Sequence, residues 1–110
     1  MTYKSWWMKL LNVETNPSLI FMIKNNLTIK NELGLHARAS NKLSTEAAKF
    51  KSKIEIIFND QIIDCKNMMD ILLLSIGIHD SFTIKISGVD EKKALESIEK
   101  LINNLFGEGK

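Results

Sequence analysis

Hydrophobic and polar residues alternate along two stretches of the chain in the manner of β-strands. In residues 23–31, IKNNLTIKN, the apolar side chains of Leu27 and Ile29 alternate with polar neighbours. The same alternation recurs in residues 81–87, SFTIKIS. Successive side chains of a strand point to opposite faces of a sheet, so this period of two predicts strands with one buried face.

A separate β-hairpin is predicted in the part of the sequence that lies between these two strands. Residues 53–58 are rich in isoleucine, and residues 61–65 form a second short strand. Asn59 and Asp60 separate the two runs, and a two-residue loop is a common tight connection between antiparallel strands. Asparagine adopts the left-handed backbone conformation of such a turn readily, and aspartate does so less easily.

Three helices are predicted in the remaining segments. From Ala37 the apolar positions recur at steps of four, four and three, which marks one helical face: Ala39, Leu43, Ala47 and Phe50. Asn67 can cap a short, almost entirely apolar helix that extends to about Leu74. A longer helix starts at Asp90 and is expected to stop at Gly107. Its apolar face comprises Ala94, Leu95, Ile98, Leu101, Ile102 and Leu105.

The order of these elements, βαββαβα, indicates an α+β domain. Four short strands would form an antiparallel sheet that shows one face to three helices and the other to solvent. With 110 residues the chain has room for one domain and one core. Hydrophobic residues make up 45% of the sequence and charged residues 25%, as in ordinary soluble globular proteins.

Charge and hydropathy argue against two classes of partner. The 15 basic and 13 acidic side chains give a net charge of +2, which is not the basic footprint of a nucleic-acid-binding protein. No apolar run reaches the roughly 18 residues that a transmembrane helix needs, so no membrane partner is expected. The lone cysteine, Cys65, cannot form an internal disulfide, which favours a reducing cytoplasm.

The first 21 residues, MTYKSWWMKLLNVETNPSLIF, differ in character from the rest. They hold both tryptophans and the only proline. Polar residues interrupt the apolar patch and no A-x-A-like site follows, so a signal peptide is not expected. We interpret residues 1–21 as a disordered extension, or as sequence upstream of a true start at Met22. An amphipathic surface helix over residues 5–13 is the alternative.

The short helix holds more apolar residues than one buried face can take. They are Met68, Met69, Ile71, Leu72, Leu73 and Leu74. Some of them must therefore be exposed, and an exposed patch of methionine and leucine usually marks a docking surface.

The segment GLHARASNKL, residues 34–43, places a histidine where a loop becomes a helix. His36 would occupy the cap of the helix beginning at Ala37, where backbone amides lack intrahelical partners and attract anions. Arg38 adds a permanent positive fork that matches phosphate geometry. The helix dipole disfavours a cation there, so helix stability does not explain the arginine. Gly34 lets the loop fold close to the imidazole.

This arrangement suits a residue that receives a phosphoryl group and hands it on. An unperturbed imidazole is largely neutral at pH 7 and is nucleophilic without a strong base. A phosphoryl group bound to His36 would lie over the helix amides and beside Arg38, with no general acid–base pair to hydrolyse it. The residues alone leave a second interpretation open, in which a surface histidine caps the helix and the arginine is incidental.

GLHARAS resembles the active-site signature of HPr, the histidine phosphocarrier of the bacterial phosphoenolpyruvate-dependent phosphotransferase system. The resemblance covers nearly all of residues 22–110 without a gap, through KNMMDILLLSIG, SGVDEKKALESIEKLI and the ending FGEG. It implies the open-faced β-sandwich of that family, in agreement with βαββαβα. Ala39, where sugar-branch HPr usually has proline, and the ending resemble the nitrogen-branch form, NPr.

The resemblance implies a role for each residue of the segment. His36 would be phosphorylated on Nδ1, Arg38 would stabilise the phosphoryl group, and the backbone amides of Ala37 and Arg38 would complete the cradle. The donor would be the phosphorylated histidine of Enzyme I, and the acceptor a histidine of an Enzyme IIA, in this branch a regulatory one. The chain would be a cytoplasmic, monomeric carrier without a cofactor, and not an enzyme.

The resemblance also implies a docking surface for these partners. It comprises Asn41, Lys42, Thr45, Met68, Met69, Leu72 and Leu73. Many HPr proteins carry a regulatory serine at the position of Asn67, which has no hydroxyl, so serine-based regulation is not expected. Asp70 adds a negative charge where glycine is common. His79 stands at a turn position often taken by glycine, and we interpret it as a loop residue.

Three other functions are weighed against this one. A metal site is not expected, because His36, Cys65 and His79 lack the short spacing of metal ligands. An RNA-binding module shares the element order, but the strands offer only Phe58 and Phe82, in apolar runs that look core-facing. A docking domain that keeps the HPr fold without the chemistry is the third. The retained histidine–arginine pair argues against it, since docking needs neither residue.

Overall fold

The computed structural model describes residues 22–110, and the expectations for residues 1–21 lie outside this range. Its four strands form one antiparallel sheet in the order β1-β4-β2-β3. The strands are β1 (Ile23–Thr28), β2 (Lys53–Phe58), β3 (Gln61–Asp64) and β4 (Ser81–Ser87).

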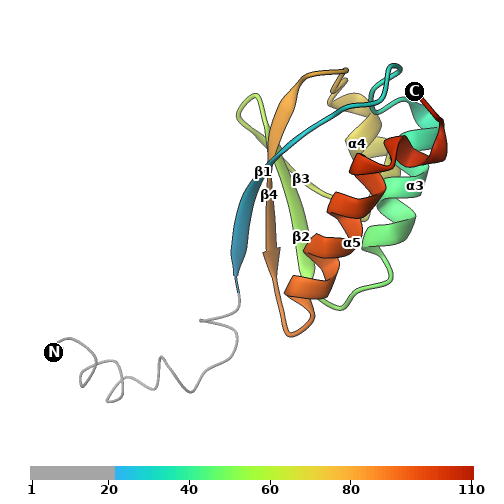
Figure 1. The fold of residues 1–110 in the computed structure, drawn as a ribbon. Helices are drawn as coiled ribbons and strands as arrows, with labels where there is room; N and C mark the ends of the chain where they lie inside the picture. Colours follow the sequence, from blue (N-terminus) through green and yellow to red (C-terminus); the bar gives the residue numbers. More distant parts are fainter. Residues whose placement is uncertain (1–21) are drawn as a thin grey trace, which may run out of the picture.

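Three α-helices pack on one side of this sheet (Figure 1). They are α3 (Ala37–Ala47), α4 (Met68–Leu73) and α5 (Glu91–Asn103), and a short 3-10 turn, η1 (Leu105–Gly107), follows α5. No helix of residues 22–110 covers the other side of the sheet (Figure 1). The predicted α+β fold, an open-faced β-sandwich with the order βαββαβα, is confirmed.

Alternate strand residues form the core against the helices. The register sets Ile56 opposite Ile84 and Leu27 opposite Phe82, and all four side chains are buried. Burial of each such side chain stabilises the fold by roughly 1.5–3 kcal/mol. Phe82 is 3% exposed and Phe58 packs against the core, so these aromatic rings do not form an exposed platform for stacking bases.

The hairpin between β2 and β3 has the predicted turn. Asn59 and Asp60 both adopt positive φ, 49° and 64°, and the residues that flank them, Phe58 and Gln61, pair directly. Two consecutive left-handed residues match the twist of the adjoining strands. Aspartate accepts this conformation here although it favours it less than asparagine does.

The last helix is shorter than the sequence predicts. It ends at Asn103, four residues before Gly107, and Leu105 and Phe106 turn the chain back with φ of 56° and 54°. A right-handed helix cannot continue through positive φ. The side chain of Phe106 is only 1% exposed, so tertiary burial of this aromatic ring accompanies a backbone conformation that its own propensity disfavours.

Two further properties bear on function. Cys65 is fully buried just after β3, and burial raises the pKa of its thiol to about 12, so the thiol is inert at neutral pH. Within residues 22–110, the helices are too short and too polar to traverse a lipid bilayer.

Candidate functional site

His36 lies at the N-terminus of α3, at the end of the loop that follows β1. It is the N-cap residue, with an extended backbone (φ −73°, ψ −177°), and its carbonyl accepts the first helical hydrogen bond from the Ser40 amide at 2.8 Å. The imidazole makes no hydrogen bond to the helix amides. The first-turn amides therefore stay available to a bound anion beside the imidazole.

The loop before His36 is fixed by contact with the segment after α4. Gly34 has φ of +66°, and a Cβ atom at this position would lie 2.8 Å from the Gly77 Cα and from the Ile76 carbonyl oxygen. The Leu35 amide donates to that same Ile76 carbonyl at 2.9 Å. Only glycine fits this close approach, so Gly34 sets the direction from which the chain reaches the imidazole.

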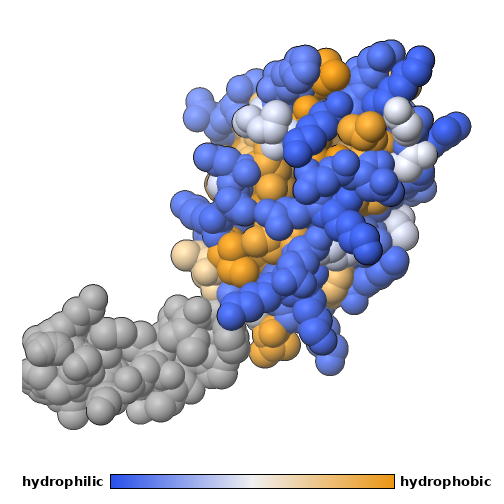
Figure 2. Space-filling view, in the orientation of Figure 1, coloured by the Kyte–Doolittle hydropathy of each residue, from blue (hydrophilic) through white to orange (hydrophobic). Residues whose placement is uncertain are grey.

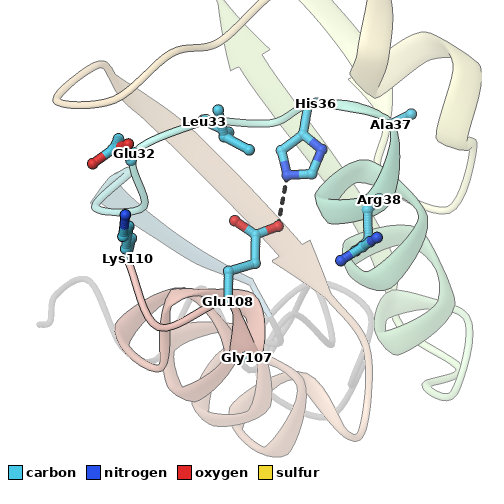
Figure 3. Close-up of a pocket in the computed structure, with 8 residues that line it drawn as sticks. All are labelled: Glu32, Leu33, His36, Ala37, Arg38, Gly107, Glu108 and Lys110. Atoms are coloured by element: carbon cyan, nitrogen blue, oxygen red, sulfur yellow. Dashed lines mark hydrogen bonds and ion pairs between the residues drawn. The ribbon is translucent and has the colours of Figure 1, made fainter.

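Arg38 extends from the first turn of α3 on the same side as the imidazole of His36 (Figure 3). It is exposed, and its guanidinium makes no hydrogen bond or ion pair with any of residues 22–110. No acidic residue occupies this turn of α3. The guanidinium and the helix dipole thus present positive charge together at one place.

A carboxylate from the far end of the chain contacts the other edge of the imidazole. The Glu108 Oε2 lies 2.6 Å from His36 Nε2 (Figure 3), and its second oxygen accepts from Asn31 Nδ2 at 3.1 Å. Both side chains are largely shielded from solvent, with 12% of Glu108 and 29% of His36 exposed. The sequence analysis did not identify Glu108 as a site residue.

The environment keeps Glu108 ionised at neutral pH. Burial raises the pKa of its carboxyl, but hydrogen bonds from His36 and Asn31, together with the positive charges of His36 and Lys42, outweigh burial and hold that pKa below its usual 4.5. An ionised carboxylate only accepts hydrogen bonds. The proton between Glu108 and His36 therefore belongs to Nε2, so in the neutral imidazole the free lone pair is on Nδ1.

These residues border an open hollow of about 770 Å³. It is lined by Glu32, Leu33, His36, Ala37, Arg38, Gly107, Glu108 and Lys110. One wall is the loop after β1 and the start of α3, and the other is the C-terminal tail, as Figure 3 shows. The two segments are tied by a hydrogen bond from the Glu32 amide to the Lys110 carbonyl at 3.0 Å.

Only a weak sequence signal points to Glu108. Glycines flank it on both sides, Gly107 with φ of +76° and Gly109 with φ of +81°, and such glycines permit a tail to fold back. Nothing local indicates that this tail returns to a histidine 72 positions earlier.

The residues expected to dock partners lie largely at the surface. Met69 and Leu73 are 53% and 73% exposed, Met68 and Leu72 are partly buried, and Asn41 and Thr45 are exposed. Lys42 is the exception, because its Nζ donates to the Phe106 carbonyl at 2.6 Å and so ties α3 to the tail. In the view of Figure 2 the surface is mainly hydrophilic, with separate hydrophobic patches.

The positions that depart from the family pattern have structural roles. The side chain of Asn67 caps α4 by accepting from the Asp70 amide at 3.1 Å. His79 is an exposed loop residue with φ of 71°, and its amide donates to the Ile29 carbonyl at 2.8 Å. Among residues 22–110, no three His, Cys, Asp or Glu side chains are grouped as metal ligands would be.

Comparison with known proteins agrees with this geometry. The family described as "PTS HPr component phosphorylation site" matches residues 23–104. Phosphocarrier protein HPr of Cupriavidus necator is 41% identical over 88 residues, which are 80% of this chain and 99% of that protein. HPr of Neisseria meningitidis is 39% identical over 88 residues, with the same coverage of both chains.

Solved structures give the same result for the fold. A crystal structure of HPr from Thermoanaerobacter tengcongensis superposes with a TM-score of 0.75 at 30% identity and covers 78% of this chain and 97% of that one. The HPr structure from Bacillus anthracis gives 0.71 at 28% identity, over 74% and 96% of the two chains. The chain belongs to the HPr family, the phosphocarrier proteins of the phosphotransferase system, which carry phosphoryl groups and are not enzymes.

Proposed function

We propose that His36 accepts a phosphoryl group on Nδ1 from phosphorylated Enzyme I and passes it to a histidine of an Enzyme IIA. The observation that carries this proposal is the free Nδ1 of an imidazole placed at the open N-terminus of α3, with Arg38 beside it. The phosphoryl oxygens would be held by the backbone amides of Ala37 and Arg38 and by the guanidinium. No cofactor is needed for this transfer.

The second part of the proposal is a docking surface on α3 and α4, which pack against each other. Asn41, Lys42 and Thr45 supply its polar part, while Met68, Met69, Leu72 and Leu73 supply its apolar part. Methionine and leucine side chains that stay exposed in a monomer adapt well to a partner surface. The exposure of Met69 and Leu73 supports this surface.

The finer assignments rest on the family resemblance. Ala39 and the FGEG ending support the nitrogen branch, with a regulatory Enzyme IIA as acceptor. We propose a cytoplasmic monomer whose functional domain is residues 22–110, preceded by an extension over residues 1–21. Asn67 lacks a hydroxyl, so this carrier would not be regulated by a serine kinase at that position.

The test is incubation of the full chain with Enzyme I and phosphoenolpyruvate, followed by intact mass and acid lability of any added phosphate. The chain has two histidines, so His79→Ala is the matched control for His36→Ala. We expect one acid-labile phosphate on wild type and His79→Ala and none on His36→Ala. Labelling of His36→Ala would contradict the assignment, and no labelling by either branch's Enzyme I would mean that the fold serves docking alone.

A further inference from the structure

Resting on the proposed function, we infer that Glu108 is a positioning residue for the phosphoryl relay. Its carboxylate holds the Nε2 proton on the His36 ring in both the empty and the loaded carrier. In the empty carrier, a proton on Nε2 leaves Nδ1 as the nucleophile. In the loaded carrier, the same proton makes neutral imidazole the leaving group. Glu108 acts through the imidazole and does not touch the phosphoryl group.

The contact itself is short and direct. His36 Nε2 and Glu108 Oε2 are 2.6 Å apart, and the carboxylate is only 12% exposed. A neutral imidazole carries its proton on one nitrogen, and the hydrogen bond made by that nitrogen selects the tautomer. The carboxylate lies on the Nε2 edge, while the other ring nitrogen faces the start of α3 (Figure 3). The two edges of one ring therefore have separate tasks.

The structure holds this carboxylate in place through its neighbours in the chain. Phe106 is buried, and its carbonyl accepts a hydrogen bond from Lys42 Nζ at 2.6 Å. Gly107 then reverses the backbone with φ of +76°. Asn31 completes the support, donating from Nδ2 to Glu108 Oε1 and, at 2.8 Å, to the Gly34 carbonyl.

The side chain of Asn31 is a second, independent observation that favours a functional role for Glu108. Its side chain is completely buried, and its Oδ1 has no hydrogen-bond partner among the described residues. A buried polar atom without a partner is unfavourable and calls for an explanation. Both of its donated bonds go to the site, one to the loop that aims His36 and one to the carboxylate behind it.

The transfer step balances without moving a proton. The P–N bond of the donor phosphohistidine breaks, its electron pair returns to the donor imidazole, and the Nδ1 lone pair of His36 forms the new N–P bond. The His36 ring then carries a positive charge, with its proton still on Nε2, opposite the negative Glu108. A charge-assisted hydrogen bond is stronger than a neutral one, so the carboxylate stabilises the ring as this charge develops.

The same proton matters when the phosphoryl group leaves. With Nε2 protonated, the N–P electron pair returns to Nδ1 and the leaving group is neutral imidazole. Without that proton the leaving group would be an imidazolate anion, which is far more basic and leaves slowly. The other charged groups that line the hollow are Arg38 from α3, Glu32 from the loop and Lys110 from the tail. Lys42 of α3 lies outside this lining, with its Nζ on the Phe106 carbonyl. None of these four makes a hydrogen bond with Nε2.

The test compares wild type, Glu108→Gln and Glu108→Ala, with Glu96→Gln as the control. The control removes the same charge from the exposed side of α5. Each protein is loaded with Enzyme I and phosphoenolpyruvate, and the loss of phosphate is followed by intact mass from about pH 5 to pH 9. We expect loss from Glu108→Gln to be about tenfold slower than wild type at neutral pH, with the rates converging in acid. If Glu108 only supported the fold, its substitution would not shift the pH dependence of the rate of phosphate loss.

A second measurement separates this inference from the proposed function. Nitrogen-15 NMR of the unloaded proteins reports the His36 tautomer without any Enzyme I. We expect the Nε2–H form in wild type and Glu96→Gln, and a mixture of tautomers in Glu108→Ala. An unchanged tautomer in Glu108→Ala overturns the inference. A rate of phosphate loss that depends on pH in Glu108→Gln as it does in wild type also overturns it. If wild type is not phosphorylated by Enzyme I, the proposed relay is wrong. The NMR measurement still shows whether Glu108 sets the tautomer, because it needs no Enzyme I.

Discussion

The N-termini of α3 and α4 belong to one helical layer but treat their free backbone amides in opposite ways. At α4, Asn67 accepts a hydrogen bond from the Asp70 amide, and Asp70 places an acid in the first turn. At α3, the His36 side chain caps no amide, and Arg38 places a cation at the positive end of the helix dipole. The start of α4 is arranged for helix stability, whereas the start of α3 is left open to an anion.

The open start of α3 is held by tertiary contacts instead of a cap. Leu35 pairs with the Ile76 carbonyl through its amide, and its own carbonyl accepts from Ser40 Oγ at 2.9 Å. Both residues are buried. These contacts fix the loop while the amides and Arg38 remain free, so a locally unfavourable helix start persists because the surrounding fold determines it.

The largest effect is expected from breaking that tertiary support with Gly34→Ala. The new Cβ would lie 2.8 Å from backbone atoms of the loop containing Gly77, and φ at this position is +66°. Backbone strain and overpacking together predict a loss of about 3 kcal/mol in the free energy of unfolding. Urea denaturation measures it, and we expect phosphorylation to fall as well, because the loop aims the imidazole.

Gly109→Ala is the matched control for that substitution. Gly109 also has positive φ, +81°, but nothing lies within 4 Å of the position its Cβ would take. Strain alone then costs about 1 kcal/mol, and the terminal position lets the tail relax part of it. Equal destabilisation by the two variants would show that the close approach at Gly34 is unimportant.

Arg38→Ala is expected to separate activity from stability at the start of α3. If Arg38 stabilises the transferring phosphoryl group as proposed, loss of the guanidinium should slow phosphoryl transfer by about a hundredfold. Removal of a cation from the first turn should raise the free energy of unfolding by about 0.5 kcal/mol. Transfer is measured by rapid-quench kinetics with Enzyme I, and stability by urea denaturation.

Lys92→Ala is the control, because Lys92 occupies the same second position in α5 that Arg38 occupies in α3. It should bring a similar small gain in stability without a change in transfer. If both variants slow transfer equally, general charge on the surface explains the effect and the site assignment for Arg38 is wrong.

The parts of the molecule that could be predicted from the sequence are those fixed by local chemistry. The strand alternation, the Asn59–Asp60 turn and the Asn67 cap each depend on residues within a few positions of one another. The position of His36 at a helix start is of the same kind. Short-range propensity and periodicity decide such features, so one sequence suffices.

The tail could not be predicted, because its conformation depends on distant contacts. Leu105 and Phe106 adopt positive φ, which their own preferences disfavour, and burial of the Phe106 ring accompanies it. That turn carries Glu108 to an imidazole 72 positions away in the sequence. No local pattern encodes a contact of this range, so the carboxylate partner of His36 is visible only in the folded chain.

The exposed side of α4 offers a test of its role that leaves the N-cap residue, Asn67, unchanged. Met69→Glu should raise the KM for Enzyme I by about tenfold, because a charge replaces an apolar contact at a 53% exposed position, with little change in folding stability. Val89→Glu is the control, at a 72% exposed apolar residue outside the proposed surface. Unchanged kinetics for Met69→Glu would remove α4 from the docking surface.

The smallest effect is expected from removing the cap that distinguishes α4 from α3. Asn67→Ala leaves the Asp70 amide without its side-chain acceptor and should lower the free energy of unfolding by about 1 kcal/mol. Asn67→Ser keeps an accepting oxygen and should retain most of that stability. Phosphoryl transfer, measured at a temperature where both variants are folded, should match wild type. A slower transfer in Asn67→Ala, but not in Asn67→Ser, would mean that the α4 cap also positions the docking surface. The start of α4 would then serve transfer as well as helix stability, and the contrast with α3 would be wrong.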